Sequence, residues 1–130
     1  IEYNCRFGDP ETQVVLPRLE TDIMDIFDAI NAGTLAQLDI RWSDKACACV
    51  ILASGGYPKS YPKGLEITGT AQKEGKLVTA GGRVLGITAL GDNLQAALDT
   101  AYAAAREVHF DGVHYRKDIG ARALAAGKCE

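Results

Sequence analysis

The first residues of the chain alternate between polar and apolar side chains. Glu2, Asn4 and Arg6 fall on one face of an extended segment, because the side chains of a strand point alternately to its two faces. Carboxylate and amide oxygens suit a hard cation such as Mg²⁺. A guanidinium binds carboxylates and phosphates through its planar fork. The alternation therefore predicts a cation-binding face with an anion-binding arginine beside it, and a solvated surface strand is the competing interpretation.

A tight acidic turn follows this segment at once. Gly8-Asp9-Pro10-Glu11 carries two carboxylates at the point where a strand edge would open into a cleft. That position favours a functional site over a plain surface strand.

Cations gather at two further places. Arg83 follows the double glycine Gly81-Gly82, and Arg116-Lys117 directly precedes Asp118. Each cation alone is most simply a surface charge. Together with an acid–amide pair, they indicate a site that binds phosphate or carboxylate at one end and a metal–nucleotide at the other. Such a combination is typical of carboxylate activation by ATP, in which charge neutralisation and positioning do most of the catalytic work.

The elements expected to position these residues follow from hydrophobic spacing. Apolar residues recur with helical period after Thr21, which we predict as an N-cap, and Gly33 is the predicted stop. Residues 34–45 form a polar connector, which we take as the boundary between the first elements and a second unit. Residues 46–53 are a nearly continuous apolar run, which predicts a buried strand.

The second half of the chain predicts a hairpin and a long helix. Residues 76–80 and 83–90 flank the double glycine, which is a hairpin signal. Asp92 is the predicted N-cap of a helix that ends near His109, with Gln95 at the capping-box position. A short strand is expected at residues 113–115. Strands combined with separate helices make an α+β pattern.

Composition excludes several classes of protein. The 130 residues suffice for one domain, or one domain plus a piece of another, and 47% are hydrophobic against 24% charged. A net charge of −3 argues against a nucleic-acid binder, and no apolar run reaches membrane-spanning length. The four cysteines contain no C-x-x-C pair, which argues against zinc and favours free thiols in a reducing, cytoplasmic setting.

Several longer motifs occur in a fixed order: E-Y-N-C-R-F-G-D-P-E-T-Q, A-S-G-G-Y-P, T-A-G-G-R-V-L-G-I-T-A-L-G and Y-R-K-D-I-G-x-R-A-L. In this order the chain resembles the C-terminal part of the glycinamide ribonucleotide synthetases, a family of the ATP-grasp superfamily, from residue 1 to about residue 124. The resemblance implies the end of an ATP-grasp domain over residues 1–40. A small C-terminal domain of mixed or antiparallel sheet with a packed helix would then occupy residues 41–130. The match begins at the family's last catalytic strand, so we expect a C-terminal portion that is inactive alone.

The resemblance also implies an activity and roles for individual residues. Enzymes of this family ligate glycine to 5-phosphoribosylamine with ATP, through a glycyl phosphate, in de novo purine biosynthesis. The implied ligands of Mg²⁺ or Mn²⁺ are Glu2 and Asn4. Arg6 would face the acyl phosphate as a catalytic residue.

The acceptor side and the ribose phosphate are assigned to residues further along the chain. Catalytic Asp9 and substrate-binding Glu11 would line the acceptor side. Charge alone assigns Arg83 and the Arg116-Lys117-Asp118 group to the ribose-phosphate end.

Two alternatives stay open. Another ATP-grasp ligase, such as a biotin carboxylase-like enzyme, would carry a Q-x-E-H-type turn where this chain has residues 7–11. A non-catalytic binding module of the same fold is the other alternative, and the presence of Glu2, Asn4 and Arg6 argues against it.

The chain departs from the family pattern at one point. Residues 67–69 run directly into residues 70–76, where family members carry additional residues including a further strand. Either this is a true deletion, or a mobile segment is missing from the numbering, and we expect the second.

Overall fold

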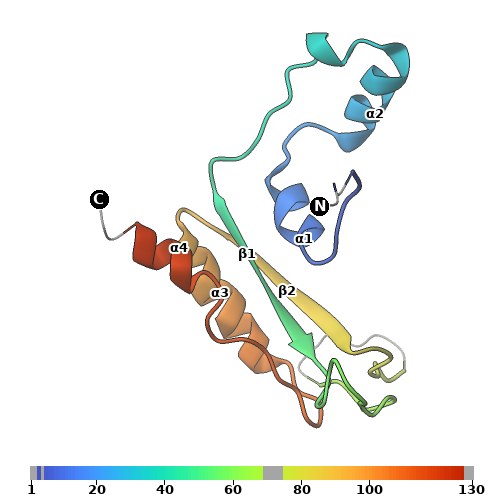
Figure 1. The fold of residues 1–130 in the computed structure, drawn as a ribbon, viewed down its shortest axis with the longest axis vertical. Helices are drawn as coiled ribbons and strands as arrows, with labels where there is room; N and C mark the ends of the chain where they lie inside the picture. The colour runs from blue at the N-terminus through green and yellow to red at the C-terminus, as the bar shows by residue number, and fades with distance from the viewer. Residues whose placement is uncertain (1–2, 4, 69–74, 128–130) are drawn as a thin grey trace.

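The structure is a computed structural model that describes residue 3, residues 5–68 and residues 75–127. Its centre is a two-stranded antiparallel sheet of β1 (Ala46–Ala53) and β2 (Arg83–Gly91) (Figure 1). The pairing runs from Ala46 opposite Gly91 to Leu52 opposite Leu85, with an irregularity before Ala53 pairs with Arg83. The predicted strand at residues 46–53 is confirmed at both ends.

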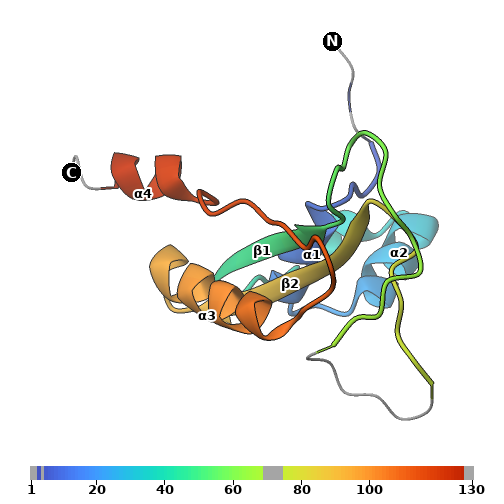
Figure 2. The same cartoon turned by 90° about the horizontal axis from the view of Figure 1, so that it is seen from below.

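Helix α3 (Leu94–Glu107) covers one face of this sheet (Figure 2). Because strand side chains alternate, β1 buries Ala48, Val50 and Leu52 on that face. The residues that α3 buries are Ala97, Leu98, Ala101 and Ala105. Three of the four are alanines, so the helix backbone can approach the strands closely.

The cap of α3 lies one residue beyond the predicted one. The side-chain oxygen of Asn93 accepts a hydrogen bond from the Ala96 backbone N–H at 2.9 Å. Asn93 has an extended backbone, with φ −148°, which directs its side chain toward the first turn of the helix. The prediction of Asp92 as the cap was therefore wrong by one position.

The first part of the chain forms short helices. These are α1 (Thr12–Val15), the 3₁₀ turn η1 (Leu16–Arg18), α2 (Ile23–Ala32) and the 3₁₀ turn η2 (Leu35–Gln37). Asp22 caps α2 by accepting from the Met24 N–H at 2.8 Å, whereas the predicted cap, Thr21, accepts from the Arg41 N–H at 2.7 Å. Gly33, at φ 69°, ends α2 as predicted.

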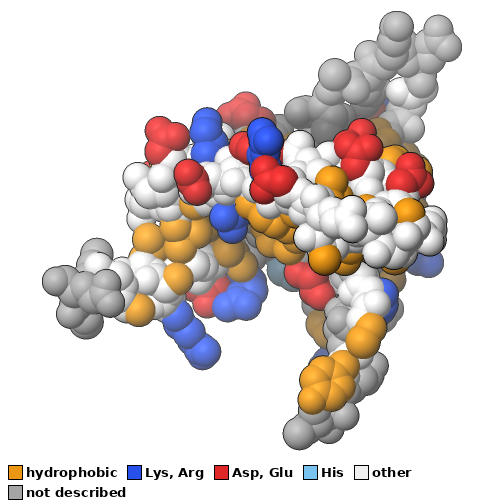
Figure 3. Space-filling view, turned by 90° about the horizontal axis from the view of Figure 1, so that it is seen from above, with side chains coloured by type: hydrophobic (Ala, Val, Ile, Leu, Met, Phe, Trp, Pro, Cys, Tyr) orange, Lys and Arg blue, Asp and Glu red, His pale blue; other side chains and the backbone are white. Residues whose placement is uncertain are grey.

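Helices α1 and α2 differ in their relation to the sheet. α1 lies on the face opposite α3, where the Cys47 thiol approaches the Gln13 carbonyl at 4.0 Å (Figure 2). α2 stands away from the sheet (Figure 1). Among the described residues before β1, Ala29 is the only hydrophobic side chain that is buried. Figure 3 shows hydrophobic side chains at the surface beside acidic ones. The exposed hydrophobic residues of this part include Met24, Phe27, Ile30, Leu35 and Trp42.

The predicted hairpin between residues 76–80 and 83–90 is wrong. β2 pairs with β1, and Val78 instead forms an isolated bridge with Glu66. Buried Ser54 donates hydrogen bonds to both glycines of the pair. Its N–H donates to the Gly82 carbonyl at 2.8 Å, and its hydroxyl donates to the Gly81 carbonyl at 2.9 Å. The two glycines therefore mark the entry into β2, not a two-residue turn.

An extended segment, residues 113–119, returns along β1 and is called the strap. The backbones of His114 and Ala53 exchange two hydrogen bonds, at 2.9 and 3.1 Å. The strand expected at residues 113–115 is thus reduced to one bridge. The strap leads into α4 (Ala121–Ala126). No helix in the described part of the chain has the length and hydropathy to cross a membrane.

Candidate functional site

The acidic turn and Arg83 meet across 74 sequence positions. A guanidinium nitrogen of Arg83 donates to the Asp9 backbone carbonyl at 3.0 Å and lies 3.4 Å from an Asp9 carboxylate oxygen. The turn is held by Thr12, whose backbone N–H donates to the Gly8 carbonyl at 3.0 Å and whose hydroxyl donates to the same oxygen. Two residues singled out from the sequence are thereby brought into contact, one from each part of the chain.

Arg83 also lines a hollow together with Arg116. The hollow has a volume of about 310 Å³ and lies at the end of β1 where the strap crosses it. Its remaining lining residues are Ile51, Ala53, Tyr57, His114 and Tyr115. Two guanidinium groups above an apolar floor make this hollow suitable for a phosphate or carboxylate carried by a larger molecule.

Arg116 is paired within the strap. Its Nε and one Nη donate to the two carboxylate oxygens of Asp118 at 2.9 and 2.8 Å. These hydrogen bonds lower the pKa of Asp118 and raise the pKa of Arg116, so both groups are charged at neutral pH. The pair holds the guanidinium plane in one orientation.

Glu11 lies on the same face of the sheet as Arg83 and Arg116. It lines a second hollow of about 310 Å³ with the Cys47 and Cys49 side of β1 and with Ile119 of the strap. Its carboxylate folds back over Gly8, where an added Cβ would lie 2.1 Å from the carboxylate oxygen. A larger residue at position 8 would push the flexible end of this side chain aside.

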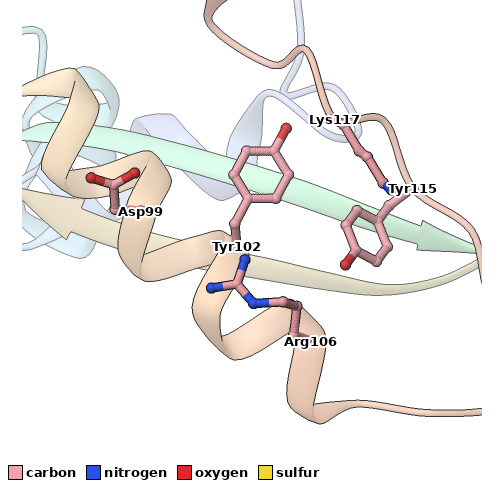
Figure 4. A pocket seen from close by; sticks show the side chains of 5 residues that line it. All are labelled: Asp99, Tyr102, Arg106, Tyr115 and Lys117. Carbon is pink, nitrogen blue, oxygen red and sulfur yellow. The ribbon is translucent and has the colours of Figure 1, made fainter.

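Lys117 lies on the other side of the strap. It lines a hollow of about 540 Å³ between the strap and α3, together with Asp99, Tyr102, Arg106 and Tyr115 (Figure 4). Consecutive residues of an extended segment point in opposite directions, so Arg116 and Lys117 serve different faces. The structure thus separates Lys117 from the two arginines with which the sequence grouped it.

The remaining predicted residues lie near the start of the chain. Glu2 and Asn4 are outside the described residues. Arg6 is exposed, and one of its Nη atoms donates to the Phe7 carbonyl at 3.3 Å. Within the described ranges, no three His, Cys, Asp or Glu side chains are arranged to hold a metal ion.

The cysteines of β1 are free thiols on the face of the site. Burial raises the pKa of the Cys47 thiol, neighbouring Cys49 raises it further, and Arg18 partly offsets the rise. Cys47 is therefore protonated at neutral pH and is a poor nucleophile.

Sequence reasoning missed Tyr57, His114 and Tyr115 as lining residues of the hollow with the two arginines. His114 and Tyr115 immediately precede Arg116, which is the only local signal for them. Tyr57 packs closely on Gly82, where an added Cβ would lie 2.1 Å from the Tyr57 ring.

A family model described as phosphoribosylglycinamide synthetase, C domain, matches residues 47–122. The chain belongs to this family. Among its relatives, the phosphoribosylamine–glycine ligase of Caldanaerobacter subterraneus is 48% identical over 93% of this chain and 32% of its own length. The trifunctional purine biosynthetic protein adenosine-3 of Gallus gallus is 46% identical over 96% of this chain and 14% of its own length.

A solved structure of the same kind supports the fold. The crystal structure of phosphoribosylamine–glycine ligase from Thermotoga maritima matches 91% of this chain and 32% of its own, at a TM-score of 0.71 and 37% identity. The chain thus spans about a third of the length of the single-function ligases it matches. The small α+β architecture expected from the sequence is confirmed, with a two-stranded antiparallel sheet packed with helices.

Proposed function

We propose that the chain acts as part of a phosphoribosylamine–glycine ligase. Such an enzyme uses ATP to join glycine to 5-phosphoribosylamine through a glycyl phosphate, giving glycinamide ribonucleotide, ADP and phosphate in purine biosynthesis. The observation that carries the proposal is the contact of Arg83 with Asp9 in a chain whose relatives bear this name. That contact joins the acidic turn to the cationic hollow of the C domain on one face of the sheet.

The two arginines of the hollow are proposed to bind the 5-phosphate of the ribose. Guanidinium groups suit phosphate because their donors match its oxygens in pairs. Arg83 already has one donor on the turn, and Arg116 is oriented by substrate-binding Asp118. Lys117 comes from the same strap but lines the opposite hollow, so we assign it a contribution of charge without contact.

The acidic turn is proposed to face the amine of phosphoribosylamine. Glu11 lies in the hollow beside β1, and Asp9 lies next to Arg83. A carboxylate near the attacking amine can accept the proton that the amine loses when it forms the amide. We assign this catalytic role to Asp9, and a substrate-binding role to Glu11.

The metal and the acyl phosphate are assigned to the first residues. Carboxylate and amide oxygens fit Mg²⁺ or Mn²⁺, so Glu2 and Asn4 are the proposed ligands. When bound, the metal neutralises charge on the phosphate oxygens of ATP. Arg6 is proposed to hold the glycyl phosphate through its guanidinium group.

We further propose that residues 1–40 belong to a catalytic ATP-grasp domain and residues 41–130 to the C domain. The family match begins at residue 47, after the polar connector. The hydrophobic residues that α2 exposes would pack against the rest of that catalytic domain. A cytoplasmic location follows from the same proposal, since purine biosynthesis draws on cytoplasmic ATP.

The test measures ADP formation by the complete protein that contains this chain. We expect turnover that needs glycine, phosphoribosylamine and Mg²⁺ or Mn²⁺ together, and none from residues 1–130 alone. Glu2→Ala should abolish metal-dependent turnover while the circular dichroism spectrum is unchanged. Glu20→Ala, which removes an exposed carboxylate outside the site, is the matched control. Unchanged turnover in Glu2→Ala would refute the metal assignment, and glycine-independent turnover would refute the ligase.

A further inference from the structure

We propose that Tyr102 is a positioning residue that sets the place of Arg116 in the phosphate-binding hollow. The inference rests on the proposed function, because it assumes that Arg116 binds the ribose phosphate. Tyr102 belongs to α3, on the side of the strap away from the hollow, so it acts on substrate only through the strap.

The evidence is the pair of hydrogen bonds made by the Tyr102 hydroxyl. It donates to the Arg116 backbone carbonyl at 2.9 Å and accepts from the Ile119 backbone N–H at 3.2 Å. A phenol oxygen can do both at once, because it carries one proton and accepting lone pairs. One side chain therefore connects the two ends of the segment from residue 116 to residue 119.

These two backbone groups are the ones that close an ordinary four-residue turn. In such a turn the carbonyl of the first residue accepts directly from the N–H of the fourth. Among the described residues no backbone hydrogen bond joins Arg116 to Ile119. The hydroxyl of Tyr102 stands between them instead, and so it sets the separation of the two ends.

The Arg116–Asp118 pair lies within the segment that the hydroxyl spans. Arg116 carries the first anchored backbone group and Asp118 lies between the two, and their bidentate contact orients the guanidinium. A change in the width of the turn would therefore move this group relative to Arg83. Loss of the hydroxyl leaves the ring in place but allows the turn to close directly or to admit water.

Other contacts hold the strap in place, but among the described residues none of them joins the Arg116 carbonyl to the Ile119 N–H. The His114 backbone pairs with Ala53 before the turn. After it, Gly120 comes so close to α3 that an added Cβ would lie 2.7 Å from Leu98 Cδ1. The Tyr102 and Tyr115 rings pack with their centroids 6.2 Å apart. Figure 4 shows Tyr102 between Asp99 and Arg106 on α3, beside Tyr115 and Lys117 of the strap. Tyr102→Phe keeps all of these contacts and deletes only the hydroxyl.

The experiment compares Tyr102→Phe with the unchanged complete protein. The probe is glycinamide ribonucleotide, the stable product, which carries the same ribose 5-phosphate, and its binding is measured by calorimetry. We expect its dissociation constant, and the KM for phosphoribosylamine, to rise roughly three- to ten-fold, as for the loss of one net hydrogen bond. The KM for ATP and for glycine should stay unchanged, so that the effect is confined to the phosphoribosylamine site. A loss of folded enzyme would instead lower the apparent kcat and leave every KM unchanged. Tyr61→Phe, the same deletion on a loop outside the strap, is the matched control and should leave all four values unchanged.

A second pair of variants separates this inference from the proposed function. Arg116→Ala alone should weaken binding of the product, and Tyr102→Phe should add little in that background, because both changes act through one group. Weakened binding in Arg116→Ala with full binding in Tyr102→Phe would overturn the positioning role alone. An equal loss from Tyr102→Phe with and without Arg116 would overturn it as well. Full binding in Arg116→Ala would overturn the phosphate assignment in the proposed function, and the inference with it.

Discussion

Two neighbouring cations of the strap illustrate how much depends on the direction of single side chains. Arg116 lines the hollow with Arg83, whereas Lys117 lines the hollow against α3. Of these two cations, only Arg116 has a carboxylate partner among the described residues, Asp118 at 2.8 Å. At this scale, the charge of a residue says less about its role than the face to which it points.

The Arg116–Asp118 pair predicts a pH dependence. Arg116 lowers the pKa of Asp118 below its ordinary value of 3.8, so the folded protein holds the carboxylate ionised to lower pH than the unfolded chain does. The pair is therefore complete above pH 3.8 and is lost as the pH falls through the lower folded pKa. Carboxyl NMR of Asp118 should show a midpoint below 3.8 that moves up in Arg116→Ala. A midpoint that does not move would contradict the pairing.

Arg83 carries a second prediction at this scale. Arg83→Ala removes a hydrogen bond and an ion pair to Asp9, both partly exposed, so the free energy of unfolding should fall by only about 0.5–1 kcal/mol. The free energy of binding glycinamide ribonucleotide should fall by much more than the free energy of unfolding does. Urea denaturation and calorimetry measure the two effects. Arg122→Ala, in α4, is the control for loss of a surface cation, and an equal effect of both variants on binding would count against a specific role for Arg83.

At the scale of elements, the junction of β2 and α3 leaves no room for a larger residue at position 91. An added Cβ on Gly91 would lie 2.4 Å from the Ala97 backbone nitrogen, and a backbone atom cannot move aside as a side chain can. Gly91→Ala should therefore displace the start of α3 and lower the free energy of unfolding by about 1–3 kcal/mol. Gly127→Ala, whose nearest neighbour would be 3.7 Å away, should have little effect. Equal melting temperatures for the two variants would show that the junction yields without cost.

The elements also show which patterns in a sequence determine structure. β1, α2 and α3 were predicted because apolar spacing acts over a few residues, although both predicted N-caps were wrong by one position. The pairing of β2 with β1 was not predicted, because a double glycine on its own indicates a hairpin. Here Ser54, on a distant segment, donates hydrogen bonds to both glycine carbonyls instead. The contact of Asp9 with Arg83 could not be predicted either, because local sequence patterns carry no information about residues 74 positions apart. Long motifs predicted the family, but they did not show that Arg116 and Lys117 line different hollows.

At the scale of the whole molecule, the described residues divide into a part with a hydrophobic core, from residue 46 onward, and an earlier part that contributes nothing to it. All members of the two hydrophobic clusters come from residues 46–124. Deletion of residues 1–44 should therefore leave a folded domain with a cooperative thermal transition, measured by circular dichroism. Leu52→Ala in the same shortened chain should lower its stability by about 2–4 kcal/mol, because Leu52 is fully buried. A shortened chain without a cooperative transition would show that α1 is needed to complete the sheet.

Ser54 has a consequence for how this family can vary in length. It fastens the two ends of the connection between β1 and β2 at Gly81 and Gly82. The entropy of closing a loop grows only with the logarithm of its length, so each doubling costs only about 0.6 kcal/mol. The relative from Pseudomonas aeruginosa aligns with all 130 residues of this chain over 145 positions, and thus carries residues that have no counterpart here. A flexible connection between β1 and β2 can therefore lengthen or shorten at little cost in free energy, because Ser54 still joins its two ends next to Arg83.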